Sequence, residues 1–143
     1  MDEHVRPLTE ADCADVADLE AAARAAMADQ RGGAVRLGEL PAVGDWRPLV
    51  GEPVWVATID GAVVGYLQLS VHGPVAEVMQ VYVHPEAREL GLGDSLLATA
   101  VQSATSLGCT RFEGTALPGD RDTKNLYERA HIVARKIVVS RPL

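Results

Sequence analysis

A chain of 143 residues and 15.2 kDa has the size of one ordinary domain. Its composition, with 48% hydrophobic and 23% charged residues, is typical of a soluble globular protein. No apolar run is as long as the roughly 20 residues needed to cross a bilayer, and the first residues lack the apolar core of a signal peptide. We therefore expect a single domain over residues 1–143 in the cytoplasm. The net charge of −7, from 13 Lys and Arg against 20 Asp and Glu, disfavours nucleic acid and membranes as partners.

Two elements are expected before residue 54. A helix is predicted over 10–29, because apolar residues recur at helical spacing and Thr9 with Asp12 forms a capping box. Residues 30–53 hold many glycines and prolines, which predicts a long loop with at most a short helix. Loops of this length are often functional. The apolar positions of the helix are Val16, Leu19, Ala23 and Met27.

Three strands should follow as an antiparallel meander. The β-branched runs 54–59 and 63–71 flank Asp60-Gly61, a strong hairpin signal, and a third run covers 77–83.

The last third of the chain predicts a helix over 91–107, a strand over 109–116, a helix over 123–130 and a closing strand over 132–140. The buried face of the first of these helices should consist of Leu92, Leu96, Ala100, Ala104 and Leu107. The alternation of helices and strands predicts an α/β fold with a mixed sheet.

Cysteine and histidine spacing excludes several kinds of site. Cys13 and Cys109 lie far apart, match neither a zinc motif nor a disulfide scaffold, and are expected to be free buried thiols. His4, His72 and His131 show no ligand spacing, so no metal is predicted. We expect His84, before Pro85, to be a strand-end residue.

Residues 81–93 run from a strand through a glycine-bearing turn into a helix. At such a corner, unpaired backbone N–H groups converge at the positive end of the helix dipole, where anions bind. Gly91 and Gly93 would let phosphate oxygens approach the backbone, and Arg88 adds a cation. Neither the dinucleotide-binding fingerprint nor the Walker loop fits the residues that follow Gly93.

Arg88, Gly91 and Gly93 at this spacing resemble the coenzyme A loop of the GNAT N-acetyltransferase superfamily. Residues 125–130 follow at the family's usual distance, and the order of elements is similar over nearly the whole chain. The resemblance implies a mixed, mostly antiparallel sheet flanked by helices and splayed between its fourth and fifth strands. It also implies an acetyltransferase that uses acetyl-CoA as cosubstrate.

The family's coenzyme contacts can be carried over by position. The backbones of Val81 and Val83 would pair with the pantetheine arm. The diphosphate would lie on the loop headed by Arg88, against Glu89, Leu90, Gly91, Leu92, Gly93 and Asp94.

Three positions depart from the family pattern. Leu90 replaces a common glycine, and Asp120 stands where an asparagine usually contacts the coenzyme. That carboxylate must either face away or be compensated by Arg121 and Lys124, and we assign Lys124 to the coenzyme site. His131 replaces a glycine that often ends the last helix.

Two residues match catalytic positions of the family. Tyr127 corresponds to the helix tyrosine that serves as general acid, the other interpretation being a packing residue. Glu77, eleven residues before Arg88, resembles the general-base glutamate of histone-type members, or is a solvated strand carboxylate.

The resemblance predicts acetyl transfer to a primary amine by direct attack in a ternary complex, with a small molecule favoured as acceptor over a protein N-terminus or lysine. The alternative is a regulatory module that binds acyl-CoA without catalysis, and a homodimer is compatible with the family. The acceptor would lie against the loop 30–53. Candidates for recognising a cation, or for ordinary packing, are Glu39, Asp45, Trp46, Trp55 and Tyr66.

Overall fold

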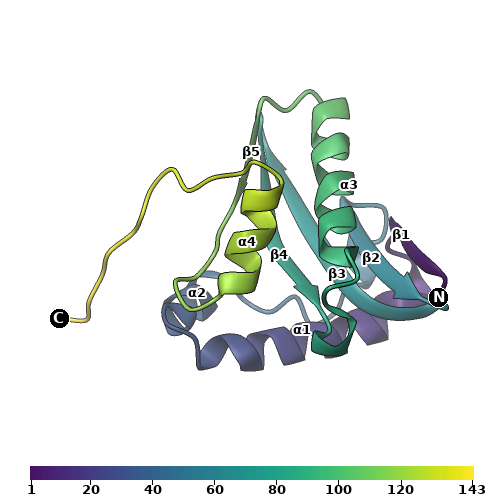
Figure 1. Ribbon diagram of the computed structural model, residues 1–143, viewed down its shortest axis with the longest axis horizontal. Helices are drawn as coiled ribbons and strands as arrows, with labels where there is room; N and C mark the ends of the chain where they lie inside the picture. Colours follow the sequence, from purple (N-terminus) through teal and green to yellow (C-terminus); the bar gives the residue numbers. More distant parts are fainter.

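The computed structural model describes residues 1–143 and contains a five-stranded sheet with the order β1-β2-β3-β4-β5 (Figure 1). Neighbouring strands are antiparallel except β4 and β5, which are parallel. The predicted α/β class, with a mixed and mostly antiparallel sheet, is therefore confirmed. The strands are β1 Glu3–Pro7, β2 Val54–Ile59, β3 Ala62–His72, β4 Val75–Val83 and β5 Arg111–Gly114.

Helices cover both faces of the sheet and create two cores. Helix α1 packs on Val54 and Val56 of β2, whereas α3 and α4 share a core with Trp55 and Ala57 of the same strand. This division follows from the alternation of side chains along a strand. The helices are α1 Cys13–Ala28, α2 Gly33–Glu39, α3 Leu92–Ser106 and α4 Arg121–Arg129, with short 3-10 turns at Glu10–Asp12, Arg47–Leu49 and Pro85–Ala87.

Most predicted elements are present with small shifts of their ends. Asp60 and Gly61 both have positive φ, of 49° and 84°, as the predicted hairpin turn requires. The predicted face of α3 is buried except for Leu107, which follows the last helical residue and is 60% exposed. Cys13 is buried and Cys109 half-buried, and both are free thiols.

Two expectations about strands are wrong. Strand β1 was not predicted, because its short polar segment shows no alternation and lies mostly exposed at the sheet edge. The predicted strand over 132–140 does not form, and the chain after α4 runs away from the sheet (Figure 1). Its β-branched residues Ile137, Val138 and Val139 have strand propensity, but they are 79–88% exposed because no neighbouring strand pairs with them.

Strand β4 pairs with β5 over only part of its length. β5 lies beside Val75–Val78, and beyond Val78 no strand pairs with that side of β4. A register shift against β3 occurs at the same place, because Val78 is opposite Leu69 whereas Gln80 is opposite Gln68. The sheet is thus splayed between its fourth and fifth strands, as predicted, and backbone groups of β4 are open to a ligand there.

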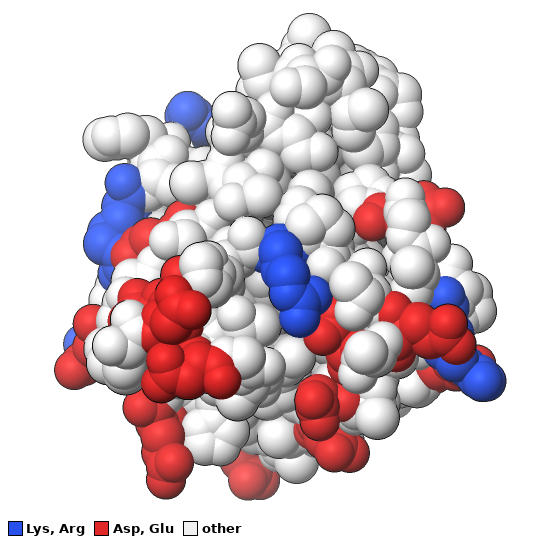
Figure 2. All heavy atoms as spheres, turned by 90° about the vertical axis from the view of Figure 1, so that its right-hand side faces the viewer, with Lys and Arg blue, Asp and Glu red and all other residues white.

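The surface agrees with the acidic composition. Figure 2 shows acidic side chains gathered over the lower half of one face, with few basic side chains among them. None of the helices has the length and apolar character needed to span a bilayer.

Candidate active site

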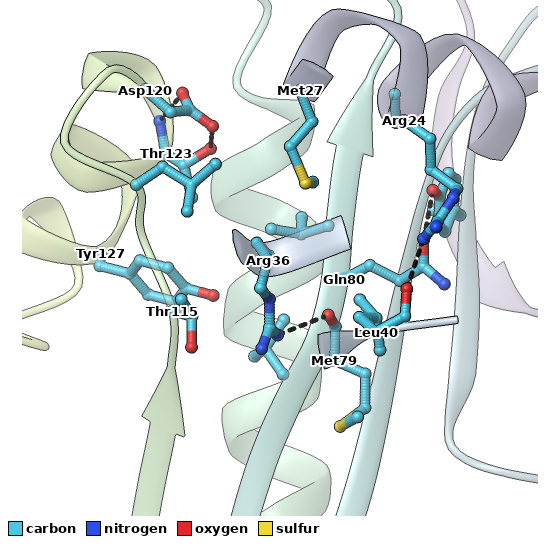
Figure 3. A pocket seen from close by; sticks show the side chains of 15 residues that line it. Arg24, Met27, Arg36, Leu40, Met79, Gln80, Thr115, Asp120, Thr123 and Tyr127 are labelled. Atoms are coloured by element: carbon cyan, nitrogen blue, oxygen red, sulfur yellow. Dashed lines mark hydrogen bonds between the residues drawn. The ribbon is translucent and has the colours of Figure 1, made fainter. Parts of the chain in front are cut away.

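A cavity of about 70 Å³ opens where β4 separates from β5 (Figure 3). Its walls come from α1, α2, β3, β4, α4 and the segment after β5. The polar side chains of its wall include Arg24, Arg36, Tyr66, Gln80, Asp120 and Tyr127. The splayed strand thus forms one side of an enclosed space that several elements complete.

Tyr127 of α4 lies in the wall of this cavity and is only 5% exposed. Its hydroxyl lies directly against Gly114, the last residue of β5, where any larger residue would overlap the ring. Burial raises the pKa of Tyr127 above its usual value, and the charge of Arg36 opposes part of that rise. The phenol is therefore protonated at neutral pH, as a proton donor must be.

Glu77 of β4 is half-buried and does not line the cavity. Its carboxylate lies 3.8 Å from His72 Nε2, and on the neighbouring strand it is opposite Glu113. The structure thus places the predicted acid, but not the predicted base, at the cavity wall.

The turn before α3 has the backbone that the predicted coenzyme loop needs. Gly91 has a φ of 79° at the helix start, and Glu89 has a φ of 71°. Leu90 is not in the left-handed region, so it tolerates the side chain that replaces glycine. The first backbone bond of α3 runs from Ser95 N–H to the Gly91 carbonyl. The N–H groups of Leu92, Gly93 and Asp94 therefore remain free, although the Leu92 side chain is buried in the core.

Arg88 joins this turn to two neighbouring elements. Its Nε donates to the carbonyl of Val83 at 3.0 Å, and its guanidinium lies 5.4 Å from the ring centre of Tyr82. Arg88 Nη1 also lies 3.4 Å from Asp122 of α4. In this arrangement the cation lies over the end of β4.

Charges on α4 face the start of α3. Asp94 accepts from Arg129 Nε at 2.9 Å, which offsets a carboxylate that would otherwise repel an anion at this helix start. Lys124 is exposed and lies 3.7 Å from Glu128 one turn later. Lys124 is thus available to an incoming anion only from the outside of α4.

Asp120 caps α4. It accepts from the Thr123 N–H at 3.1 Å and from the Thr123 hydroxyl at 2.6 Å. Both bonds turn the carboxylate onto its own helix, which accounts for an acidic residue at this position. His131, which replaces a glycine, has a φ of 63° and ends the same helix in the left-handed region.

Sequence reasoning missed a buried polar network behind the cavity. Glu20 of α1 is 2% exposed and accepts from the N–H groups of Val43 and Gly44 and from Gln80 Nε2, each at 2.9 Å. Gln80 in turn accepts from the Tyr66 hydroxyl at 2.7 Å. The sequence signal for this network was Glu20 itself, because it is a carboxylate on the otherwise apolar buried face of α1.

Only one of the five predicted acceptor contacts lines the cavity, namely Tyr66. Trp46 and Trp55 are core residues, and Glu39 is exposed. Asp45 is exposed too, and hydrogen bonds from Arg47 hold the pKa of that carboxyl down to about 2. Sequence reasoning missed two cavity arginines, Arg24 and Arg36.

Comparison with known proteins points to one family. The sequence model of the acetyltransferase (GNAT) family matches residues 21–131. No curated protein matches the chain in sequence.

Among solved structures, a GCN5-related N-acetyltransferase from Ralstonia eutropha JMP134 is similar over 99% of both chains, with 20% identity and a TM-score of 0.71. AAC(6')-Iy, solved with the bisubstrate analogue CoA-S-monomethyl-acetylneamine, covers 100% of this chain and 99% of its own, with 14% identity and a TM-score of 0.70. A ribosomal-protein-alanine N-acetyltransferase from Brucella melitensis biovar Abortus 2308 covers 99% and 98%, with 19% identity and a TM-score of 0.68. At these identities the likeness is one of fold.

Proposed function

Because the chain belongs to the acetyltransferase (GNAT) family, we propose that it transfers an acetyl group from acetyl-CoA to a primary amine of a small molecule, by direct attack in a ternary complex. One observation carries the proposal: beyond Val78 no strand pairs with the open side of β4, and Tyr127, a protonated phenol, lines the cavity at that place.

The residues fit the coenzyme. The backbone of Val81 and Val83 would pair with the pantetheine arm, since β5 does not cover that part of β4. The diphosphate would accept from the N–H groups of Leu92, Gly93 and Asp94, with Arg88 as the nearby cation. Lys124 would assist from the outer surface of α4.

The reaction needs a neutral amine and a proton for the leaving thiolate. The amine nitrogen attacks the thioester carbonyl, the new C–N bond forms, and the C–S bond breaks as the tetrahedral intermediate collapses. Tyr127 would donate its proton to the departing sulfur. Glu77 would receive the amine proton through water, because its carboxylate is not in the cavity wall.

The non-catalytic alternative also has an observation in its favour. A cavity of about 70 Å³ is small beside the roughly 300–1,000 Å³ of ligand pockets in general. A protein that bound acyl-CoA without an acceptor would need no larger acceptor pocket.

Calorimetric titration with acetyl-CoA and CoA, followed by thiol-release assays on amines, amino acids, polyamines and short peptides, separates these functions. We expect binding and turnover, with Arg88→Gln weakening coenzyme affinity by about tenfold, as the loss of a charge-assisted contact does. Binding without turnover would favour the regulatory module. Absence of coenzyme binding would refute both.

A further inference from the structure

The cavity contains two arginines that have no carboxylate partner, and from them we propose that the acceptor amine carries a carboxylate group which Arg36 binds, with Arg24 as the second cation. The acceptor would then be an amino acid or a compound with the same two groups. This inference rests on the proposed function and names the substrate class of the same site.

The contacts of both arginines leave most of their donors free. Arg36 Nη2 donates to the carbonyl of Met79 at 3.3 Å, and Arg24 Nη1 donates to the carbonyl of Leu40 at 2.6 Å (Figure 3). Both side chains are half-buried and line the cavity, and neither takes part in an ion pair. A guanidinium has five N–H donors, so a second acceptor can bind without displacing these carbonyls.

Carboxylates of the protein itself are near but already satisfied. Glu20 is held by two backbone N–H groups and by Gln80, and Asp120 is held by Thr123. In a chain with a net charge of −7, two half-buried cations left without a counter-ion indicate an anionic ligand at this place.

The coenzyme diphosphate is assigned to a different place. Arg36 is bonded to Met79 in the middle of β4, whereas the free N–H groups of α3 come after the end of that strand at Val83. Four residues of extended strand place Met79 and Val83 about 13 Å apart. The cavity of about 70 Å³ suits a small planar group, and the fork of a guanidinium matches a carboxylate with two parallel bonds.

The position of Arg36 also suits the reaction. Its charge acts on Tyr127, and the two side chains lie in the same cavity (Figure 3). A carboxylate bound there would anchor the acceptor next to the proposed acid. The two cations would also favour the neutral form of its amine, which is the form that attacks.

The test compares matched acceptors. Each of the twenty amino acids and its carboxamide, which keeps the amine but lacks the carboxylate, is assayed for thiol release from acetyl-CoA. We expect kcat/KM for the preferred amino acid to exceed that of its amide at least tenfold. Arg36→Gln should reduce this ratio to below threefold, whereas Arg47→Gln, an exposed arginine outside the cavity, should leave it unchanged.

A binding measurement keeps the test independent of turnover. N-acetylglycine should bind the CoA-saturated protein at least tenfold more tightly than N-acetylglycinamide, and Arg36→Gln should remove the difference.

If amides are acetylated as well as amino acids, or only amines without a carboxylate react, the inference is wrong while the proposed function stands. Equal binding of the two glycine compounds also overturns it. Failure to bind coenzyme refutes the proposed function instead. If Arg36→Gln does not fold, the acid-to-amide ratios of the wild-type protein decide.

Discussion

Helices α3 and α4 begin on the same side of the splayed sheet, yet their first turns are built differently. α3 starts at Gly91, which has no side chain to cap the helix, and its first N–H groups have no acceptor. α4 starts at Asp120, whose carboxylate binds Thr123. The difference leaves backbone donors free at the start of α3, whereas α4 satisfies its own start and contributes a side chain, Tyr127, to the cavity wall.

The contribution of α4 can be removed with Tyr127→Phe. We expect kcat to fall about 100-fold or more, because a positioned proton donor contributes at least that factor, while the affinity for CoA changes less than twofold. Steady-state kinetics and calorimetry measure the two quantities. An unchanged kcat would show that the buried hydroxyl is only a packing group.

A third helix start shows what a carboxylate contributes when it is buried with a cation. Asp12 is 4% exposed and accepts hydrogen bonds from Arg6 at 2.7 and 2.9 Å and from the Thr9 N–H. The pKa of Asp12 is lowered, chiefly because of the hydrogen bonds from Arg6. Asp12→Asn should reduce the free energy of unfolding by about 2 kcal/mol at pH 7. Since the folded pKa lies below the unfolded one of about 3.9, this stabilisation is present above about pH 4 and is lost as the pH falls through the folded value.

The control for Asp12 is an exposed pair with the same geometry. Asp45 binds Arg47 through two bonds of 2.9 Å at the surface. Asp45→Asn should leave the free energy of unfolding nearly unchanged, because solvent screens an exposed ion pair. Urea unfolding at pH 7 and pH 3 checks both variants, and equal losses would mean that burial is not what strengthens the Asp12 pair.

The start of α3 can be changed at Gly91, whose φ of 79° disfavours any Cβ. Gly91→Ala should destabilise the fold by about 1 kcal/mol and weaken CoA binding severalfold, because the strained turn would shift the free N–H groups. Gly108, at the other end of α3, has a φ of 84° and is equally open. Gly108→Ala should thus cost similar stability and leave CoA affinity intact. Equal effects on affinity would contradict a coenzyme role for the start of α3.

The smallest effect is expected at the start of α4. Asp120→Ala removes the cap and should lower the free energy of unfolding by about 1 kcal/mol. Asp120→Asn should keep most of the stabilisation, because asparagine also caps helices well. CoA affinity should change less than twofold in both. A strong effect of Asp120→Ala on calorimetric affinity would show that this carboxylate acts on the coenzyme rather than on its own helix.

Local patterns predicted the parts of the molecule that local chemistry determines. The hairpin at Asp60-Gly61, the buried face of α3 and the glycine turn before it all depend on residues close in sequence. The closing strand was wrong because strand propensity at Ile137–Val139 does not supply a neighbour to pair with. Propensity therefore indicates what a segment can form, and pairing decides whether it does.

The cavity was harder to foresee than the glycine turn before α3. Arg24 and Arg36 come from α1 and α2, and they meet β4 and α4 only in the folded chain. No spacing in the sequence distinguishes them from surface arginines. Asp120, in contrast, stood out as a departure from the family, and its distance of three residues from Thr123 was already a capping signal.

Glu20 ties two parts of the cavity wall, its own helix α1 and Gln80 of β4, to the segment at Val43 and Gly44, since its carboxylate accepts from Gln80 and from the N–H groups of that segment. The entropy of ordering this wall is therefore lost when the chain folds and not when a ligand arrives. A preorganised wall of this kind adapts little to its ligand. Discrimination between acceptors should then come from shape and charge, with little contribution from induced fit.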